Sequence, residues 1–315
     1  MGSDNSLLEL YNVSKTLSGK RIIRNASFAV NKGDFFGLIG PNGAGKSSLL
    51  NIIVTLAKKT SGTIYFKGCD TTKKTNSYRK SIGYAPQDTC FYKELTVLEN
   101  MNNFAMMYDC KKNKSRHMIN ELLSLVDLKE SKNILAKDLS GGMQRRLNIA
   151  CSLIHNPELV IMDEPAANLD HHQREEIWKL LTSINQRGTT IIISSHLLHD
   201  MNRLCNRVAF MFKGSVLFTG TPQELQDKFK RNVIVHISTV PGNYGMIISA
   251  LRPALIINSH EVKDNILTMN ITNTNYAIHH MVHILDELGE YIVDIEVEKP
   301  SLDDTFEEII RRFGK

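Results

Sequence analysis

The sequence is poor in cysteine and has no long hydrophobic run. Its five cysteines are Cys69, Cys90, Cys110, Cys151 and Cys205. Their odd number, wide spacing and lack of a CxxC pair favour a reduced cytosolic chain over a disulfide-bonded one. No apolar run approaches the roughly 18–20 residues that cross a bilayer, and no secretory signal opens the chain. If the protein acts on a membrane, we therefore expect another polypeptide to supply the membrane-spanning part.

Low-complexity tracts are also missing from the 315 residues. The length suits two domains that together bury a sizeable core. Residues 1–219 hold 29 Lys and Arg against 19 Asp and Glu, a net charge of +10, whereas residues 220–315 hold 9 against 14, a net charge of −5. A basic first part suits a polyanionic ligand, and the opposite sign of the remainder indicates a separate module.

Strand and helix periodicities can be followed along the first part. Apolar or alternating runs bounded by turns predict strands, and apolar residues three or four positions apart predict helices. Strands are expected at residues 7–13, 35–39, 62–67, 82–85, 159–162 and 189–194, with a closing hairpin at 208–212 and 216–219. Helices are expected at residues 48–54 and 173–186 and, interrupted by the charged stretch 111–114, between 97 and 126.

The second part begins after a turn at Gly220, Thr221 and Pro222, and residues 223–229 are predicted to form a short helix. Beyond it we expect a strand, a helix, two strands, a helix and a strand, at residues 233–238, 244–251, 255–258, 266–271, 276–288 and 292–297, and then a final helix at 302–313. This βαββαβ order matches a ferredoxin-like α+β sandwich. We therefore expect a first domain over residues 1–220 with a helical part at about 89–156, a linker helix over 221–231, and a C-terminal α+β domain over 232–315.

The strongest motif follows the predicted strand 35–39. Residues 40–47 fit the phosphate-binding pattern G-x-x-x-x-G-K-[ST] between a strand and a helix, which is the context that the motif requires. The glycines allow a tight turn whose N–H groups surround a triphosphate, Lys46 brings positive charge to the phosphates, and the Ser47 hydroxyl is a ligand for Mg²⁺. The expected nucleotide-binding residues in this stretch are Gly40, Pro41, Asn42, Gly43, Ala44, Gly45, Lys46, Ser47 and Ser48.

Polar residues also follow three other predicted strands. Asp163 and Glu164 end the run 159–162, where Asp163 can hold Mg²⁺ and Glu164 can accept a proton from an attacking water. Gln87 can reach both the metal and that water, and His196 can donate to the γ-phosphate. Asp170 lies six residues beyond Glu164. Singly, Gln87, His196 and Asp170 are better explained as caps or satisfied polar residues, and only the ordered combination is specific.

A second glycine turn, LSGGMQRR, occupies residues 139–146. Ser140, Gly141 and Gly142 precede an amphipathic run, so a hydroxyl and two N–H groups cap a helix N-terminus, which is a favourable site for an anion. One domain therefore carries two stretches suited to phosphate.

In this order, the motifs resemble the Walker A, Q-loop, signature, Walker B, D-loop and H-loop sequences of ATP-binding-cassette (ABC) ATPases. They fall at residues 40–47, 87, 139–144, 159–164, 170 and 196. The similarity covers about residues 7–230, and the signature together with the tail EKPSLDDTF at 298–306 resembles the ATPases of ABC-2-type drug and lipid exporters. The resemblance implies an α/β P-loop NTPase fold with a RecA-like core, an antiparallel β subdomain and a helical subdomain.

The resemblance also implies how the residues act. ATP is bound by the Walker A residues, Mg²⁺ is organised by Ser47, Gln87 and Asp163, Glu164 is the general base, and His196 positions the γ-phosphate. In related ATPases the signature faces the nucleotide of a second subunit in a head-to-tail dimer. Ser140, Gly141 and Gly142 are therefore expected to complete the site of a partner, most simply a second copy of the chain.

The implied membrane partner is a permease with about six spans, which places the ATPase on the inner, cytoplasmic face of the cell membrane. Residues 89–100 would receive it, although Phe91 and Tyr92 are equally well explained as core. No nucleic-acid partner is expected. A soluble ABC ATPase with a regulatory, resistance, or nucleic-acid- or ribosome-associated role is the alternative, and a single cassette without a coiled-coil insert disfavours it.

The sequence departs from the family pattern at two positions. Leu17 stands where an aromatic side chain usually stacks on adenine, so we expect modest discrimination between ATP and GTP, since base stacking on an aromatic ring is worth roughly 1–3 kcal/mol. Asn168 stands in the D-loop where a small residue is common, which bears on signalling between subunits but leaves Asp170 in place.

Overall fold

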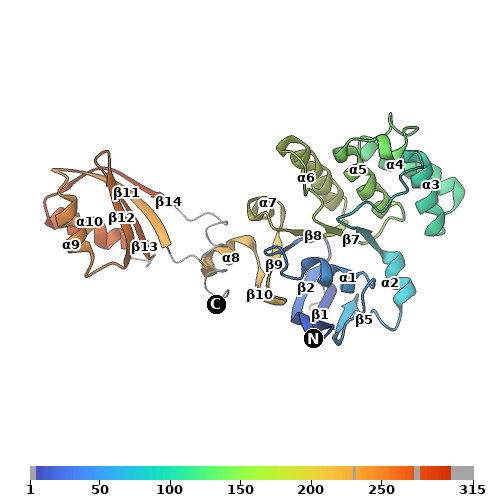
Figure 1. The fold of residues 1–315 in the computed structure, drawn as a ribbon, viewed down its shortest axis with the longest axis horizontal. Coiled ribbons are helices and arrows are strands. Elements are labelled where there is room, and N and C mark those ends of the chain that lie inside the picture. The colour runs from blue at the N-terminus through green and yellow to red at the C-terminus, as the bar shows by residue number, and fades with distance from the viewer. Residues whose placement is uncertain (1–4, 230–231, 273–276, 299–315) are drawn as a thin grey trace. The chain divides into compact units, whose positions relative to one another are not determined.

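The computed structural model describes residues 5–229, 232–272 and 277–298. It divides into two compact units, one extending to Pro222 and one beginning at Gln223 (Figure 1). Each unit has its own hydrophobic core. The predicted final helix at 302–313 lies outside the described residues.

The first unit contains a six-stranded sheet in the order β10-β9-β3-β8-β7-β6 and a four-stranded sheet in the order β2-β1-β4-β5. The strands of the larger sheet are β3 (Phe35–Ile39), β6 (Ile82–Ala85), β7 (Leu159–Asp163), β8 (Thr190–Ser195), β9 (Arg207–Phe212) and β10 (Ser215–Gly220). All neighbours from β9 to β6 pair in parallel, and β10 pairs with β9 in antiparallel fashion. The smaller sheet is antiparallel, with β1 (Ser6–Leu17), β2 (Lys20–Asn31), β4 (Ser61–Phe66) and β5 (Cys69–Asp70).

Seven α-helices are described in this unit up to residue 204. They are α1 (Lys46–Ile53), α2 (Thr75–Ser81), α3 (Val97–Met107), α4 (Lys112–Leu125), α5 (Gly141–Leu153), α6 (His171–Gln186) and α7 (Leu198–Leu204). Helices α3, α4 and α5 pack against one another and form the helical part of the unit (Figure 1). Helix α3 begins with a capping box, in which the Thr96 side chain accepts from the Glu99 N–H and the Glu99 side chain accepts from the Thr96 N–H.

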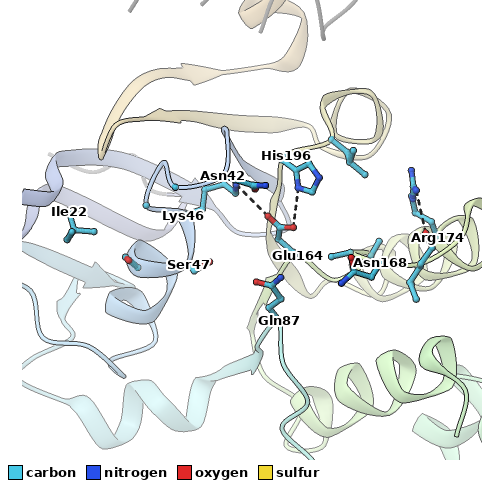
Figure 2. A pocket seen from close by; sticks show the side chains of 16 residues that line it. Ile22, Asn42, Lys46, Ser47, Gln87, Glu164, Asn168, Arg174 and His196 are labelled. Atoms are coloured by element: carbon cyan, nitrogen blue, oxygen red, sulfur yellow. Dashed lines mark hydrogen bonds and ion pairs between the residues drawn. The ribbon is translucent and has the colours of Figure 1, made fainter. Parts of the chain in front are cut away.

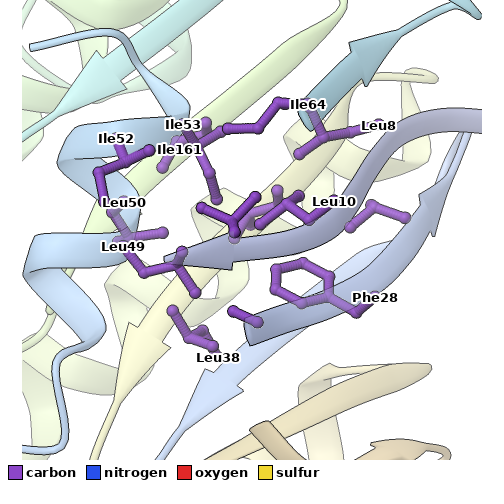
Figure 3. Packing of buried hydrophobic residues seen from close by; sticks show 14 of the residues in the cluster. Leu8, Leu10, Phe28, Leu38, Leu49, Leu50, Ile52, Ile53, Ile64 and Ile161 are labelled. Atoms are coloured by element: carbon purple, nitrogen blue, oxygen red, sulfur yellow. The ribbon is translucent and has the colours of Figure 1, made fainter. Parts of the chain in front are cut away.

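The core of the first unit lies between the two sheets and includes the buried face of α1 (Figure 3). Leu49, Leu50 and Ile53 of α1 are fully buried there. The core side chains labelled in the figure also include Leu8, Leu10, Phe28, Leu38, Ile52, Ile64 and Ile161. Burial of each such side chain contributes about 1.5–3 kcal/mol. This packing fixes the helix whose first residues are Lys46 and Ser47.

Strand β2 and helices α2 and α7 were not among the predicted elements. Strand β2 forms a hairpin with β1 through a turn at Ser18 and Gly19, both with positive φ. The register between the strands shifts at several points between Leu10 and Thr16, and β2 exposes Arg24, Asn25 and Ser27. These shifts interrupt the two-residue alternation that identifies a strand in the sequence.

The second unit contains β11 (Asn232–Val240), α9 (Tyr244–Leu251), β12 (Ile257–Lys263), β13 (Ile266–Thr272), α10 (Ala277–Glu287) and β14 (Tyr291–Glu298). Helix α8 (Pro222–Phe229) precedes them. The sheet is antiparallel in the order β12-β13-β11-β14. The strand expected at 255–258 is displaced to 257–263, because β12 is an edge strand whose residues from Asn258 to Lys263 are exposed and largely polar.

Candidate nucleotide site

Four neighbouring parallel strands end at one edge of the six-stranded sheet. The glycine turn beginning at Gly40 follows β3, Gln87 follows β6, Glu164 follows β7 and His196 follows β8. In open α/β sheets, ligands bind in the crevice outside the carboxyl ends of the strands. Strands β3, β7 and β8 are buried along their whole length, and the polar residues of β7 and β8 nearest the crevice are Asp163, Ser194 and Ser195 at their carboxyl ends.

The glycine turn is closely surrounded by backbone. A Cβ atom on Gly40 would lie 2.1 Å from the Met211 carbonyl oxygen, so no larger residue fits without movement of β9. Gly45 is the N-cap of α1 and has φ of 102°, a conformation that side chains other than hydrogen disfavour. The turn therefore delivers the first N–H groups of α1, and their partial positive charge, toward the crevice.

Lys46 is nearly fully buried, with 5% of its surface exposed. Its ammonium group donates to the carbonyl oxygens of Gly40 at 2.8 Å and Pro41 at 3.3 Å, and it lies 3.5 Å from Glu164 Oε1. Burial lowers the pKa of Lys46, while the Glu164 carboxylate works in the opposite direction. The lysine is thus a poorly hydrated cation that a phosphate can reach through the crevice.

Glu164 is held from both sides (Figure 2). Its Oε1 faces Lys46 and its Oε2 lies 3.1 Å from His196 Nδ1. Its backbone has φ of 46°, which costs about 1–3 kcal/mol for a residue other than glycine. The Glu164 N–H donates to Ser194 Oγ at 2.9 Å, which helps to hold this conformation. The strained backbone turns the carboxylate into the crevice rather than along the strand.

The expected metal ligands supply only oxygen atoms, which is the donor set that Mg²⁺ prefers. Ser47 and Gln87 both line the crevice. Asp163 is buried behind it, and its Oδ1 accepts a hydrogen bond of 2.5 Å from Ser194 Oγ. A hydroxyl, an amide oxygen and a carboxylate from three separate segments are therefore chemically suited to Mg²⁺, with Ser47 and Gln87 in the crevice and Asp163 behind it.

Lys46, Ser47, Gln87, Glu164 and His196 line a cavity of about 770 Å³. Its lining residues are Ile22, Asn42, Gly43, Gly45, Lys46, Ser47, Ser48, Gln87, Glu164, Ala166, Ala167, Asn168, Leu169, Arg174, His196 and Leu197. Figure 2 shows Lys46, Gln87 and His196 arranged around the Glu164 carboxylate. The structure thus brings together Asn42, Gly43 and residues 45–48 of the first glycine turn with Gln87, Glu164 and His196, which follow β6, β7 and β8.

Other predicted residues, among them Gly40, Pro41, Ala44 and Asp163, do not line this cavity. Leu17 is 60% exposed at the end of β1. Asp170 is the N-cap of α6 and accepts from the Gln173 N–H at 2.8 Å. Ser140 caps α5 in the same way, accepting from the Met143 N–H at 3.3 Å, and Gly141 and Gly142 begin that helix. The second glycine turn therefore presents a helix N-terminus outside the cavity of its own chain.

Seven lining residues were not among the predicted site residues: Ile22, Ala166, Ala167, Asn168, Leu169, Arg174 and Leu197. Ile22 comes from β2, the strand that was not predicted. Asn168 has φ of 61° and turns the chain beside Glu164. Arg174 lies on α6, where its guanidinium donates to the Leu169 carbonyl at 3.5 Å and lies 4.0 Å from Asp200. Its position one turn after the Asp170 N-cap was the only signal in the sequence.

Comparisons with known proteins place these motifs in one family. A model of the family described as ABC transporter matches residues 23–167. The linearmycin resistance ATP-binding protein LnrL of Bacillus subtilis (strain 168) is 32% identical over 306 residues, which cover 95% of this chain and 97% of the relative. The Nod factor export ATP-binding protein I of Sinorhizobium fredii is 36% identical over 234 residues, which cover 72% of this chain and 68% of the relative.

Solved structures show the same likeness over about 70% of the chain. CbiO1 of Clostridium perfringens, described as part of the ABC transporter complex CbiONQ, is matched with a TM-score of 0.66 at 27% identity, over 71% of this chain and 92% of the other. The ATP-binding cassette MJ0796, in a dimeric post-hydrolysis state bound to ADP and Pi, is matched with a TM-score of 0.62 at 27% identity, over 69% of this chain and 99% of the other.

Proposed function

The chain belongs to the ABC transporter family as an ATP-binding subunit related to those of ABC-2-type exporters, and from this membership we propose that it hydrolyses ATP to drive export. The observation that carries the proposal is the convergence of Lys46, Gln87, Glu164 and His196 on one cavity beside a glycine turn. That set supplies a phosphate-binding cation, a water-orienting amide, a base and a γ-phosphate donor.

The contacts support a sequence of events on this chain. The N–H groups at the start of α1 and the Lys46 ammonium bind the phosphates of ATP. The phosphates then compete with Glu164 for Lys46, so the carboxylate becomes free to accept a proton from the attacking water. His196 exchanges its contact with Glu164 for the γ-phosphate. A magnesium ion, held by Ser47, Gln87 and Asp163, would neutralise charge on the β- and γ-phosphates.

A dimer completes the proposal. Ser140, Gly141 and Gly142 form a capped helix N-terminus outside the cavity, and such a terminus binds an anion. We propose that it meets the γ-phosphate held by a second copy of the chain, with Asp170 close to the same junction. The dimeric state of MJ0796 with ADP and Pi gives a precedent in the family.

Export needs a separate membrane protein. Among the helices of the described residues, none has the length and apolar character of a membrane span, and CbiO1 is described as part of a multi-protein transporter complex. We propose a permease with about six spans, bound at the inner face of the cell membrane through residues 89–100. In that segment Phe91 is buried, whereas Tyr92 is 49% exposed and remains available for the partner.

We propose that the C-terminal part, residues 232–315 after a linker helix over 221–231, is a ferredoxin-like accessory domain attached to an ATPase domain over residues 1–220. Its antiparallel sheet with neighbours β12-β13-β11-β14, and the helices α9 and α10 between strands, support that class. LnrL matches along 95% of the chain and therefore extends through this domain as well.

The test is ATP turnover by the purified chain, with and without Mg²⁺. The wild type should hydrolyse ATP only with Mg²⁺, and Glu164→Gln should lower turnover by about a thousandfold or more while ATP binding persists. With ATP, the Glu164→Gln variant should elute as a dimer on gel filtration. The Ser140→Arg variant with ATP should elute as a monomer. Turnover without Mg²⁺, or an ATP-bound Glu164→Gln monomer, would contradict the proposal. Stimulation of hydrolysis by nucleic acid would instead favour the soluble alternative.

A further inference from the structure

Two side chains of α5 hold the backbone of the segment 86–90, which contains Gln87. Asn148 Oδ1 accepts from the Cys90 N–H at 2.9 Å, and Asn148 Nδ2 donates to the carbonyl oxygens of Pro86 at 3.0 Å and Asp88 at 3.4 Å. Arg145 Nη1 donates to the Gln87 carbonyl at 3.0 Å and to that of Pro86 at 3.4 Å. Four backbone groups within five residues are therefore bound by one helix.

Asn148 is buried, with 1% of its surface exposed. A buried polar side chain is costly unless its hydrogen bonds are made, and here both ends of the amide are used by the same segment. Aspartate would lose the donor and leucine would lose both groups. The Asn148 side chain therefore stabilises the backbone of residues 86–90 and not that of its own helix, α5.

Arg145 lies three residues before Asn148, so the two side chains leave the same face of α5. Burial lowers the pKa of Arg145, and the carboxylates of Asp88, Asp163 and Glu164 oppose that shift. A partly desolvated guanidinium needs close acceptors, and the carbonyl oxygens of Pro86 and Gln87 provide them.

The side chain of Gln87 has no such support. It lines the cavity with Lys46, Ser47 and Glu164, and within the described residues it makes no hydrogen bond of its own. Its position is therefore set by the backbone of residues 86–90. An error of about 1 Å in the placement of a group that orients a reactant can lower a rate about a hundredfold.

We propose that Arg145 and Asn148 are positioning residues that place Gln87 for ATP hydrolysis, an inference that rests on the proposed ATPase function. Because α5 begins at the Ser140 cap, the same helix carries the signature turn and, about 12 Å further along its axis, the Asn148 amide. A shift of the helix at its signature end is thereby passed to Gln87 in the same chain.

A double-mutant cycle tests this role. Asn148→Ala and Arg145→Gln should each lower kcat about ten- to a hundredfold, with the Kd for ATP changed by less than about threefold. On a Gln87→Ala background neither substitution should lower kcat further, because the group that they place is gone. Asn102→Ala is the matched control, since Asn102 is an exposed helical asparagine that donates only to Leu98 of its own helix.

Losses that add on the Gln87→Ala background would overturn the positioning role, and so would wild-type kcat in both single variants. If Asn148→Ala does not fold, Arg145→Gln carries the cycle alone, because Arg145 is only half-buried. Hydrogen exchange gives a readout apart from activity: the Cys90 amide should exchange faster in Asn148→Ala than in the wild type or Asn102→Ala. Unchanged exchange would refute the proposal that Asn148 holds the backbone of residues 86–90. A wild type that hydrolyses no ATP would reject the proposed function itself, whatever the exchange result.

Discussion

The two units of the molecule bury charge in different ways. In the first unit, buried Lys46 opens onto a cavity and contacts the Gly40 carbonyl and the Glu164 carboxylate. In the second unit, buried Glu290 accepts the N–H groups of Gly242 and Asn243, both at 2.8 Å. The lysine can exchange its partners for a ligand, whereas the glutamate closes a loop. A buried charge whose partners a ligand can replace, such as Lys46, indicates a binding or catalytic site. A buried charge whose partners belong to the fold, such as Glu290, indicates a structural role.

The two kinds of sheet explain why the first unit collects reactive groups and the second does not. Parallel strands end at the same edge, so residues following β3, β6, β7 and β8 meet although they are far apart in the sequence. The second sheet is antiparallel, and its strands end alternately at opposite edges. Its strands therefore do not bring all of their carboxyl ends to a single edge.

The largest expected effect is on Lys46. Lys46→Ala should lower ATP turnover by about a thousandfold or more, because no other side chain of the glycine turn brings a positive charge to the phosphates. The thermal unfolding temperature should change little, because the contacts of the Lys46 ammonium group with the Gly40 and Pro41 carbonyls and with Glu164 are ones that a phosphate can replace. Steady-state hydrolysis and circular dichroism measure the two quantities, and Lys59→Ala, which removes a surface lysine bonded to the Gly62 carbonyl, is the control.

The converse is expected for Glu290. Burial by itself would raise the pKa of Glu290, but the Asn243 and Gly242 N–H groups outweigh it and hold the pKa below its usual value. Glu290→Ala leaves those N–H groups without an acceptor and should lower the unfolding free energy of the second unit by about 1–3 kcal/mol. Hydrogen exchange over residues 232–298 of the full chain reports this loss, with exposed Glu287→Ala as the control. A fall in ATP turnover of Glu290→Ala that matched its loss of stability would contradict the structural role assigned to Glu290.

A smaller effect is expected for base selectivity. Because aliphatic Leu17 stands at the expected stacking position and is 60% exposed, the wild type should prefer ATP to GTP by less than about tenfold, or about 1.4 kcal/mol. Leu17→Tyr should increase the preference, and Leu56→Tyr, at another exposed leucine, should not. Competition between the two nucleotides in a hydrolysis assay measures the ratio, and a strong ATP preference in the wild type would remove Leu17 from the nucleotide site.

The smallest effect concerns acid stability of the first unit. His155 stacks on Tyr108 with ring centroids 3.7 Å apart, and burial lowers its pKa, against which the hydrogen bond to the Ile82 carbonyl acts. The unfolded chain therefore binds a proton near the ordinary histidine pKa while the folded chain does not, so stability falls as the pH drops below about 6.5. His155→Gln should flatten that part of the pH dependence of denaturant unfolding, whereas exposed His117→Gln should leave it unchanged.

Sequence reasoning succeeded where one local rule decides the structure. The apolar runs 35–39 and 82–85 and the helix 244–251 have the bounds of β3, β6 and α9, because a short buried strand or an amphipathic helix with clear turn signals is specified by its own residues. Most of the predicted residues of the first glycine turn meet Glu164 in the cavity for the same reason, since motif and strand end coincide.

It failed where distant partners decide. Strand β2 pairs with β1 through irregular register and contacts β10 of the other sheet. Its own residues therefore do not alternate cleanly, and Ile22 was lost from the predicted site with it. The hydrogen bonds of Arg145 and Asn148 with residues 86–90 join positions that are 58 to 62 residues apart. No pattern within either stretch indicates that contact.

The closeness of Gly40 to the Met211 carbonyl has a consequence for genetics. Every missense change in the Gly40 codon introduces at least a methyl group where only 2.1 Å separates it from an oxygen atom of the neighbouring strand. All such alleles should therefore behave as nulls regardless of which amino acid they encode. A single base change in that codon should therefore abolish the activity without deletion of the gene.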